Sequence, residues 1–337
     1  MKGYRIAYPA ARTAKLEPFD LPENCPSGSV LLKTEYTLIS PGTEKAMLLA
    51  MPNTCNGAGF PRYPGYSATG KILAIGDGVT DLKAGDRVVA YHSPHASISI
   101  KEQRHVVRIE DAALDSKTAV FAIIAAMGLQ GVRKLKVELG ESVMVMGLGL
   151  LGLFATQCAR LSGAMPVIAV DFSEARRALA LKLGADHAFS PDHDAKNLAA
   201  TIKSLTGGGV NAVAEITGAP NAVKQAFACM APMGRISLTG CSRTSTPDVD
   251  FYNDVHKPGI TIIGAHNFVR PSENSFPGYW TLRDDLKMLL RFFAADRLHA
   301  APLISDIVAP QNAPEVYQRL ATGDTNPPGI LFDWRNF

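Results

Sequence analysis

A glycine-rich turn between a strand and a helix constrains this fold more than any other sequence feature. Residues 147–152 read Gly-Leu-Gly-Leu-Leu-Gly, directly after the apolar run Val143–Met146 and before a helical pattern. In such a unit the first glycine permits a tight turn, the second lets the backbone approach a pyrophosphate, and the third lets helix and strand pack closely. The helix N-terminus offers free N–H groups to the phosphates. The turn therefore predicts a dinucleotide site that includes Gly147, Gly149, Leu150, Leu151 and Gly152.

The next predicted strand ends in an acidic residue. Asp171 follows the run Val167–Val170 and lies about 20 residues beyond the third glycine. Its carboxylate can accept hydrogen bonds from the ribose hydroxyls of NAD and would repel the 2′-phosphate of NADP. Arg176 and Arg177, one turn into the next helix, would weaken that discrimination. We therefore expect NAD rather than NADP. The alternative is a glycine turn that serves packing alone, with Asp171 as a helix cap.

Strand-like and helical segments alternate from residue 142 onward. This alternation predicts a doubly wound parallel sheet with helices on both faces, and thus an α/β fold. Gly163, Gly184 and Gly207 fall where helix C-terminal caps are expected. The expected strands are 143–146, 167–170, 187–189, 212–216, 235–238 and 260–263, and the expected helices are 150–162, 174–183, 195–205 and 219–230.

The regions before and after this alternating segment show a different sequence pattern. Short β-type runs such as 30–32, 70–75 and 87–90, broken by Gly and Pro, predict a mostly antiparallel β domain before Asp115. A helix is expected over 118–134, and the tail is expected to return to the first domain. The tail's predicted elements are 282–294, 304–308, 313–321 and 329–332. We thus expect one domain from 1–117 and 266–337 and a dinucleotide-binding domain from 118–265.

Composition excludes several classes of protein. With 337 residues the chain is too long for one ordinary core. The net charge of +3 comes without a basic run, which argues against a nucleic-acid partner. No apolar stretch reaches ~18 residues without a charge or breaker, and the N-terminus lacks a signal-peptide core, so we expect no membrane partner and a cytoplasmic location. The five cysteines form no C-x-x-C pair and are interpreted as free thiols.

Short segments along nearly the whole chain resemble the medium-chain dehydrogenase/reductase superfamily. Besides the glycine-rich turn they are Gly85-Asp86-Arg87-Val88, Val170-Asp171, Leu183-Gly184-Ala185, Glu215-Ile216-Thr217-Gly218, Gly234-Arg235-Ile236 and Thr261-Ile262-Ile263-Gly264. The resemblance implies a GroES-like, mostly β catalytic domain beside a Rossmann domain, with a small-molecule substrate in the cleft between them. More narrowly, the segments 40–44, 63–67 and 93–96 resemble the group typified by hydroxyethyl bacteriochlorophyllide dehydrogenases.

The resemblance also extends the expected cofactor contacts and suggests an assembly. The strand around Thr261–Gly264 resembles the edge by which superfamily members pair their sheets, and an unpaired apolar edge is an aggregation hazard. We therefore expect a homodimer or homotetramer. The added cofactor contacts are Arg176, Thr217, Thr239, Gly240, Ala265 and His266.

The sequence departs from the superfamily at its metal ligands. Zinc-containing members have Cys-Gly-Thr-Asp where this chain has Pro41-Gly42-Thr43-Glu44, and Gly-His-Glu where it has Gly65-Tyr66-Ser67. The stretch 121–126 supplies no third ligand, and no cysteine lies between Cys55 and Cys158 to build a structural zinc lobe. Catalytic zinc needs three protein ligands, so we expect no zinc. A relocated site is disfavoured because its candidate ligands lack helical spacing; they are Glu44, His92, His95 and His105.

Without a metal, hydride transfer needs a hydrogen-bond donor or general acid beside the substrate oxygen. By resemblance, Thr43 matches a hydroxyl that touches this oxygen, and Tyr66 stands where the histidine ligand would be. His92 and His95 fall in a loop whose counterpart lines the substrate pocket. We expect Tyr66 or His92 as proton donor, Thr43 as the group that orients the substrate, and His95 as a further candidate. Each also has a purely structural interpretation, as a turn hydroxyl, a packed ring or a loop histidine.

The expected function is a zinc-independent oxidoreductase that transfers hydride between NAD(H) and a small-molecule alcohol or ketone. One alternative is an enone or quinone reductase, although such relatives usually prefer NADPH and Asp171 argues against that. A pigment dehydrogenase and a non-catalytic nucleotide-binding relative stay open, since a fold does not guarantee a function.

Overall fold

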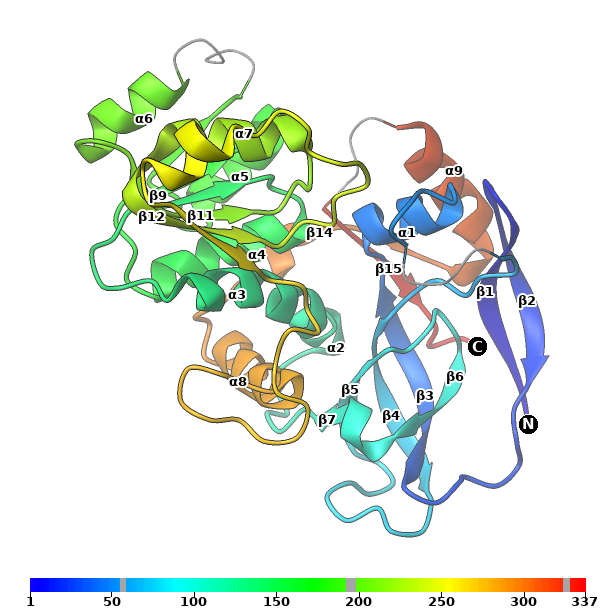
Figure 1. Cartoon of the computed structure of the whole chain (residues 1–337). Coiled ribbons are helices and arrows are strands. Elements are labelled where there is room, and N and C mark those ends of the chain that lie inside the picture. Colours follow the sequence, from blue (N-terminus) through cyan, green and yellow to red (C-terminus); the bar gives the residue numbers. More distant parts are fainter. Residues whose placement is uncertain (55–58, 192–197, 324–327) are drawn as a thin grey trace. The chain divides into compact units, whose positions relative to one another are not determined.

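The structure, a computed structural model, describes residues 1–54, 59–191, 198–323 and 328–337 and divides into two compact units (Figure 1). The first unit comprises Met1–Ile123 and Trp280–Phe337, and the second comprises Ile124–Tyr279. The chain crosses at 123/124 and 279/280 rather than at the expected 117/118 and 265/266.

Hydrogen bonds explain the later crossings. The Ser67 hydroxyl donates to the Val120 carbonyl at 2.6 Å, which holds residues after 117 to the first unit. The Gln130 side-chain amide donates to the Val269 carbonyl at 2.8 Å, which holds residues after 265 to the second unit.

The second unit is built on a six-stranded parallel sheet. Its strand order is β10-β9-β8-β11-β12-β13, so the order reverses between β8 and β11. All five strand pairs are parallel, which confirms the predicted parallel sheet. In this arrangement ligands bind outside the carboxyl ends of the strands at the reversal. The strands are β8 (Val143–Met146), β9 (Val167–Val170), β10 (His187–Phe189), β11 (Val210–Glu215), β12 (Met230–Leu238) and β13 (Thr261–Gly264).

Helices cover both faces of this sheet, with α6 and α7 on one face and α3 and α4 on the other (Figure 1). Buried side chains such as Ile202, Val223 and Phe227 pack against the strand residues Ile168 and Val213. The first three residues of the expected helix 195–205 lie outside the described residues. The elements are α3 (Ala122–Leu135), α4 (Leu150–Leu161), α5 (Glu174–Lys182), α6 (Leu198–Thr206), α7 (Pro220–Cys229) and the helical turn η2 (Phe251–His256).

Most predicted boundaries in the second unit agree with the structure to within two residues. The cap glycines are confirmed, because Gly163, Gly184 and Gly207 follow helix ends with φ of 90°, 107° and 71°. The start of β12 was wrong: the strand begins at Met230 rather than at residue 235. Met230 pairs with Val210, and the register then shifts before Ala212. This irregular pairing leaves no mark in the local hydrophobic pattern.

The first unit contains a mostly antiparallel sheet, as predicted. Among the described residues it has seven strands, in the order β14-β15-β3-β4-β5-β7 with β6 paired to β3, and a separate hairpin formed by β1 and β2. Only the pairing of β14 with β15 is parallel within the described part of this sheet. The strands are β1 (Lys2–Ala10), β2 (Thr13–Asp20), β3 (Ser29–Leu38), β4 (Ser67–Ile75), β5 (Arg87–Tyr91), β6 (Ile98–Glu102), β7 (Val106–Arg108), β14 (Ile304–Val308) and β15 (Gly329–Asp333).

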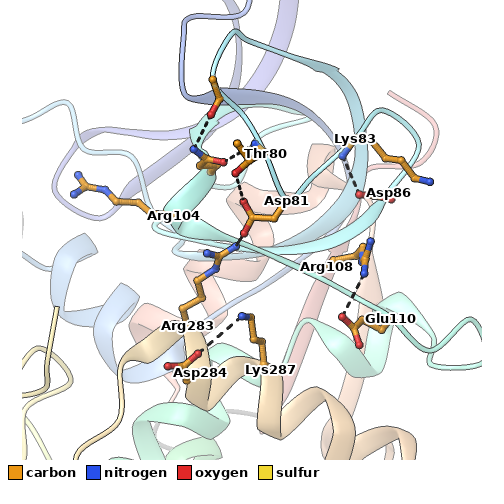
Figure 2. A network of polar contacts seen from close by, with 12 residues as sticks. Thr80, Asp81, Lys83, Asp86, Arg104, Arg108, Glu110, Arg283, Asp284 and Lys287 are labelled. Carbon is orange, nitrogen blue, oxygen red and sulfur yellow. Dashed lines mark hydrogen bonds and ion pairs between the residues drawn. The ribbon is translucent and has the colours of Figure 1, made fainter. Parts of the chain in front are cut away.

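Helices and a polar network close the first unit. Figure 2 shows Arg283 of α8 donating to Asp81, in the loop between β4 and β5, at 2.6 Å, while the Thr80 hydroxyl donates to the same carboxylate at 3.0 Å. The Arg283–Asp81 ion pair ties the tail of the chain to the loop between β4 and β5, and the tail returns to the first domain as predicted. The helical elements are α1 (Pro41–Leu48), α2 (Ser116–Ala119), α8 (Leu282–Ala294), α9 (Ala313–Thr322) and the short turns η1 (Gln103–His105), η3 (Ala301–Leu303) and η4 (Pro310–Asn312).

The helix expected over 118–134 is interrupted near Val120, which separates α2 from α3. Residues Ser116–Leu135 are long and apolar enough to cross a membrane by length and composition alone. In the structure 78% of the most apolar window is buried inside the protein. A core helix accounts for this pattern, because a buried helix is apolar on most of its surface.

An ion pair between β12 and the segment before β8 should set part of the acid stability. The Arg235 guanidinium donates to both Glu141 carboxylate oxygens, at 2.9 and 2.5 Å, and these bonds hold the pKa of Glu141 below its ordinary value. We expect Glu141→Gln to cost about 1–3 kcal/mol of unfolding free energy at pH 7. A carboxyl with a lowered pKa stabilises the fold above its unfolded pKa, and this contribution is lost as pH falls through the folded value.

Urea unfolding from pH 7 to pH 3 checks this prediction. The difference in unfolding free energy between Glu141→Gln and the parent should shrink as the parent's Glu141 carboxylate becomes protonated. Glu138→Gln, at an exposed neighbouring residue, is the control. A deficit that stays constant down to pH 3 would contradict the assigned ion pair.

Candidate functional site

The glycine-rich turn has the close contacts that its sequence predicts. Gly147 follows β8 with a φ of 90°, and Gly149 is the N-cap of α4. A Cβ on Gly152 would lie 1.8 Å from the Gly147 carbonyl oxygen, so no larger residue fits there. A Cβ on Gly149 would meet nothing within 4 Å. Gly152 is therefore required by packing, whereas Gly149 leaves space open beside the helix N-terminus, where a phosphate would lie.

Asp171 is tied to the same turn. Its carboxylate accepts the Leu148 N–H at 2.7 Å and the Ser173 N–H at 2.8 Å. The nearest Arg176 guanidinium nitrogen lies 3.9 Å from the carboxylate. Arg177 instead donates to two backbone carbonyls, those of Asp171 and Phe172, at 2.8 Å each. Asp171 thus links the carboxyl ends of β8 and β9, the place where a ribose would meet the turn.

The later predicted cofactor residues also follow carboxyl ends of neighbouring strands. Thr217 follows β11, while Thr239 and Gly240 follow β12. The Thr239 and Gly240 N–H groups both donate to the Glu215 carbonyl, at 2.9 and 3.0 Å. A Cβ on Gly240 would lie 2.4 Å from the Gly218 nitrogen. The two turns are therefore packed backbone to backbone beside the glycine-rich turn.

Sequence reasoning missed the role of Glu215 as an individual residue. Its carboxylate is almost fully buried and accepts hydrogen bonds from the Thr217 N–H and hydroxyl and from the Gly218 N–H. Burial raises the pKa of Glu215, while the bonds from Thr217 and Gly218 act against that rise. The signal in the sequence was a glutamate at the end of an apolar strand, followed one residue later by Thr217-Gly218.

Ala265 and His266 follow β13 at the edge of the sheet. Ala265 is buried, and its N–H donates to the Leu238 carbonyl at 3.0 Å. His266 is exposed, and its Nδ1 accepts the Phe268 N–H at 3.3 Å. The cofactor residues predicted from sequence therefore lie beside the carboxyl ends of the parallel strands.

In the first unit, Thr43 lies in the first turn of α1 and is partly exposed. The next residue, Glu44, is buried and reaches back to the N-cap, where it accepts the Ser40 N–H at 2.8 Å. Its second carboxylate oxygen accepts the Tyr317 hydroxyl at 2.5 Å and lies 3.0 Å from His95 Nε2. Burial, followed by the charge of Glu44, raises the pKa of Tyr317, which keeps its hydroxyl a donor.

His95 lies in the core rather than at the surface. His95 is fully buried. Its Nδ1 lies 2.6 Å from the Thr37 hydroxyl and its Nε2 lies 3.0 Å from Glu44, so both ring nitrogens have hydrogen-bond partners. A direct catalytic role for His95, one of the sequence expectations, would require an accessible ring nitrogen. The burial of His95 therefore does not support a direct catalytic role.

Tyr66 lies directly before β4 and is partly exposed. Its position is fixed from both sides in the chain. Ser67 is buried and bonded to Val120, and Gly65 has a φ of 98° and would place a Cβ 2.7 Å from the His95 backbone nitrogen.

His92 differs from its neighbour His95. It is exposed, has a φ of 55°, and its ring makes edge contacts with Tyr91 and His105, at centroid distances of 5.1 and 5.3 Å. Partial burial of the ring, followed by the charge of Lys101, lowers the pKa of His92. Less of the protonated, donating form is therefore present at neutral pH.

The donor set does not fit a zinc site. Pro41, Tyr66 and the apolar start of α3 stand where the superfamily's ligands would be, and none carries a suitable N, S or O donor group. Within the described ranges, no group of three or more His, Cys, Asp or Glu side chains is arranged to hold a metal ion. Glu44 and His95 do meet, but other protein groups already occupy their polar atoms.

A cavity of about 240 Å³ in the first unit lies elsewhere. It is lined by residues of α8, of the following turn and of the loop before α2, including Leu114, Phe293 and His299. Its described lining includes none of Thr43, Tyr66, His92 and His95. The cavity therefore does not mark the predicted substrate residues.

Known protein families match both parts of the chain. Residues 26–163 match the alcohol dehydrogenase GroES-like domain, and residues 151–283 match the zinc-binding dehydrogenase family. An L-threonine 3-dehydrogenase of Pyrococcus horikoshii is 29% identical over 279 residues, covering 74% of this chain and 79% of that protein.

Solved structures share the complete fold. A short chain alcohol dehydrogenase of Escherichia coli CFT073, complexed with NADH, gives a TM-score of 0.82 at 15% identity, covering 98% of this chain and 99% of the other. A protein of Sinorhizobium meliloti 1021 described as a zinc-binding dehydrogenase, bound to NADP, gives 0.81 at 20% identity, covering 99% of both chains.

The two glycines of the turn should respond differently to alanine. Gly152→Ala should destabilise the chain by about 1–3 kcal/mol because its Cβ meets the Gly147 carbonyl, and dinucleotide affinity should fall with it. Gly149→Ala should leave the melting temperature unchanged but weaken binding at least tenfold, because its Cβ would occupy the space of a pyrophosphate.

Differential scanning fluorimetry and a fluorescence titration with NADH and NADPH measure both quantities. Gly149→Ala serves as the stability control for Gly152→Ala. Parental affinity in the Gly149→Ala variant would contradict phosphate binding at this turn.

Proposed function

Since the chain belongs to the medium-chain dehydrogenase/reductase superfamily, whose two domains it carries in order, we propose that it is a zinc-independent, NAD(H)-dependent alcohol or ketone oxidoreductase. The glycine-rich turn joined to Asp171 carries the proposal. It supplies a site for the phosphates and a carboxylate for the ribose hydroxyls at the carboxyl ends of neighbouring strands. A nicotinamide cofactor held by this turn and Asp171 would supply the hydride for reduction of a carbonyl carbon, and a protein side chain would donate the proton to the carbonyl oxygen.

The preference for NAD rests on the charge of Asp171. A 2′-phosphate beside this carboxylate would be repelled. Arg177 donates to backbone carbonyls, and a guanidinium nitrogen of Arg176 lies 3.9 Å from Asp171 itself, so both guanidinium groups lie against protein acceptors. The solved relatives include one complexed with NADH and one bound to NADP, which leaves the choice to the residues of this chain.

Zinc independence rests on the donor set, and it assigns the proton step to side chains. Zinc would supply a Lewis acid at the substrate oxygen, but the ligand positions here hold proline, tyrosine and apolar residues. We assign proton donation to Tyr66 and orientation of the substrate oxygen to Thr43, both partly exposed. His92 is the weaker donor candidate because its lowered pKa disfavours the imidazolium form.

Assembly through β13 is part of the proposal. β13 is an edge strand within its described sheet, and its side chains are exposed or partly exposed, Ile262 by 38%. Such an edge is prone to pair with another chain. We infer a homodimer or a homotetramer built from it, and a monomeric mass in sedimentation velocity would exclude both.

Cofactor preference tests the assignment of Asp171. The parent protein should use NADH at least tenfold better than NADPH in kcat/KM, and Asp171→Asn should narrow this ratio about tenfold or more by removing the charge. Glu174→Gln, which removes an exposed charge three residues away, is the control. An unchanged ratio in Asp171→Asn, or a parental preference for NADPH, would contradict the proposal.

Turnover of a panel of alcohols, ketones and enones tests the metal-free mechanism. Activity should survive dialysis against a chelator, with substoichiometric zinc by mass spectrometry. Tyr66→Phe should lower kcat about 100-fold or more with unchanged NADH affinity. His92→Asn should keep a kcat close to that of the parent. Stoichiometric zinc, or parental kcat in Tyr66→Phe, would overturn the mechanism. Turnover of enones alone would identify a double-bond reductase.

A further inference from the structure

We propose that Glu44 and His95 are positioning residues that hold Thr43 and Tyr66 together at one site through a buried hydrogen-bond network. The inference rests on the proposed function, because it concerns the two hydroxyls assigned to the substrate. The network is defined by five side chains: Thr37, Glu44, His95, Tyr317 and Trp334.

The donor and acceptor groups of the side chains set the direction of each hydrogen bond in the network. The Trp334 indole N–H can only donate, and it donates to the Thr37 hydroxyl oxygen at 2.9 Å. The Glu44 carboxylate can only accept, so the neutral His95 ring carries its proton on Nε2, 3.0 Å from Glu44, and Nδ1 accepts the Thr37 hydroxyl hydrogen at 2.6 Å. With this tautomer, every donor in the network meets an acceptor.

Glu44 has three donors for its two oxygens. Besides His95, the Tyr317 hydroxyl and the Ser40 N–H donate to it, at 2.5 and 2.8 Å. A buried carboxylate without such partners would be strongly disfavoured. Because the Ser40 side chain makes no cap bond, Glu44 is the side chain that holds the start of α1 in the described structure. Thr43 belongs to this first turn.

The same histidine contacts the backbone before Tyr66. The backbone N–H of His95 donates to the Pro64 carbonyl at 2.9 Å, and a Cβ on Gly65 would lie 2.9 Å from the His95 ring. One side of His95 therefore holds the residue after Thr43, and the other holds the residue before Tyr66. Two segments more than 20 positions apart in the sequence are joined through one buried residue, whose ring bonds Glu44 and whose backbone bonds Pro64.

The histidine variants separate positioning from plain core stability. His95→Gln places an amide nitrogen where Nε2 was and keeps a donor for Glu44. His95→Asn keeps an acceptor near Thr37 but leaves Glu44 without that donor. We expect His95→Asn to lower kcat at least tenfold with unchanged NADH affinity, and His95→Gln to recover most of it. His299→Asn, at a histidine of the same unit outside the network, should match the parent.

An activity-free readout keeps this inference distinct from the proposed function. In protein labelled with 3-fluorotyrosine, the Tyr66 signal, assigned by its loss in Tyr66→Phe, should shift in His95→Asn and return toward the parent position in His95→Gln. Nitrogen NMR should place the His95 proton on Nε2. If no substrate is turned over but the fluorine shifts occur, the proposed function fails and the positioning role stands.

The opposite outcome would overturn the positioning role. It would be a lowered melting temperature in His95→Asn, with parental kcat in the folded fraction and an unmoved Tyr66 signal. If His95→Asn does not fold, Tyr317→Phe removes one donor from Glu44 while keeping the packed ring. That variant should give a smaller loss of kcat with unchanged NADH affinity, and parental kcat there would equally contradict the inference.

Discussion

The contact between Gly152 and the Gly147 carbonyl is the constraint on which the second unit depends. With only 1.8 Å available to a Cβ, helix α4 can begin directly above the end of β8 only because this residue is glycine. That start places the helix N-terminus at the point where the strand order reverses. Asp171 then closes the turn from β9 through the Leu148 N–H. This close contact and the Asp171 bond thus fix the turn at which the proposed phosphate and ribose sites lie.

The first unit depends on a buried set of polar side chains around Glu44 and His95. Both residues are oriented by protein donors and acceptors, within a core that includes Tyr317 and Trp334. The cost of burying a carboxylate is offset because each of its oxygens accepts at least one hydrogen bond.

Local patterns were sufficient for much of the fold. β8 and β9 could be predicted to the residue, because fully buried parallel strands are short apolar runs bounded by turns. The bounds predicted for the partly buried β10 also agree with the structure. The start of β12 and the break between α2 and α3 could not be predicted, since both depend on partners distant in sequence. For the candidate site, the glycines and Asp171 were visible in sequence. The burial of His95 was not, because loop histidines are alike in sequence whether buried or exposed.

The sequence by itself determined the dinucleotide turn, the alternation of strands and helices, and the absence of suitable donors at the superfamily's ligand positions. These are properties of residue type and spacing, which a linear chain carries without being folded. Only the tertiary structure decided which histidine is exposed, which carboxylate Tyr317 and His95 share, and where the chain passes between its two units. Burial and hydrogen-bond partnership are relations between distant segments, so they arise only when the chain has folded.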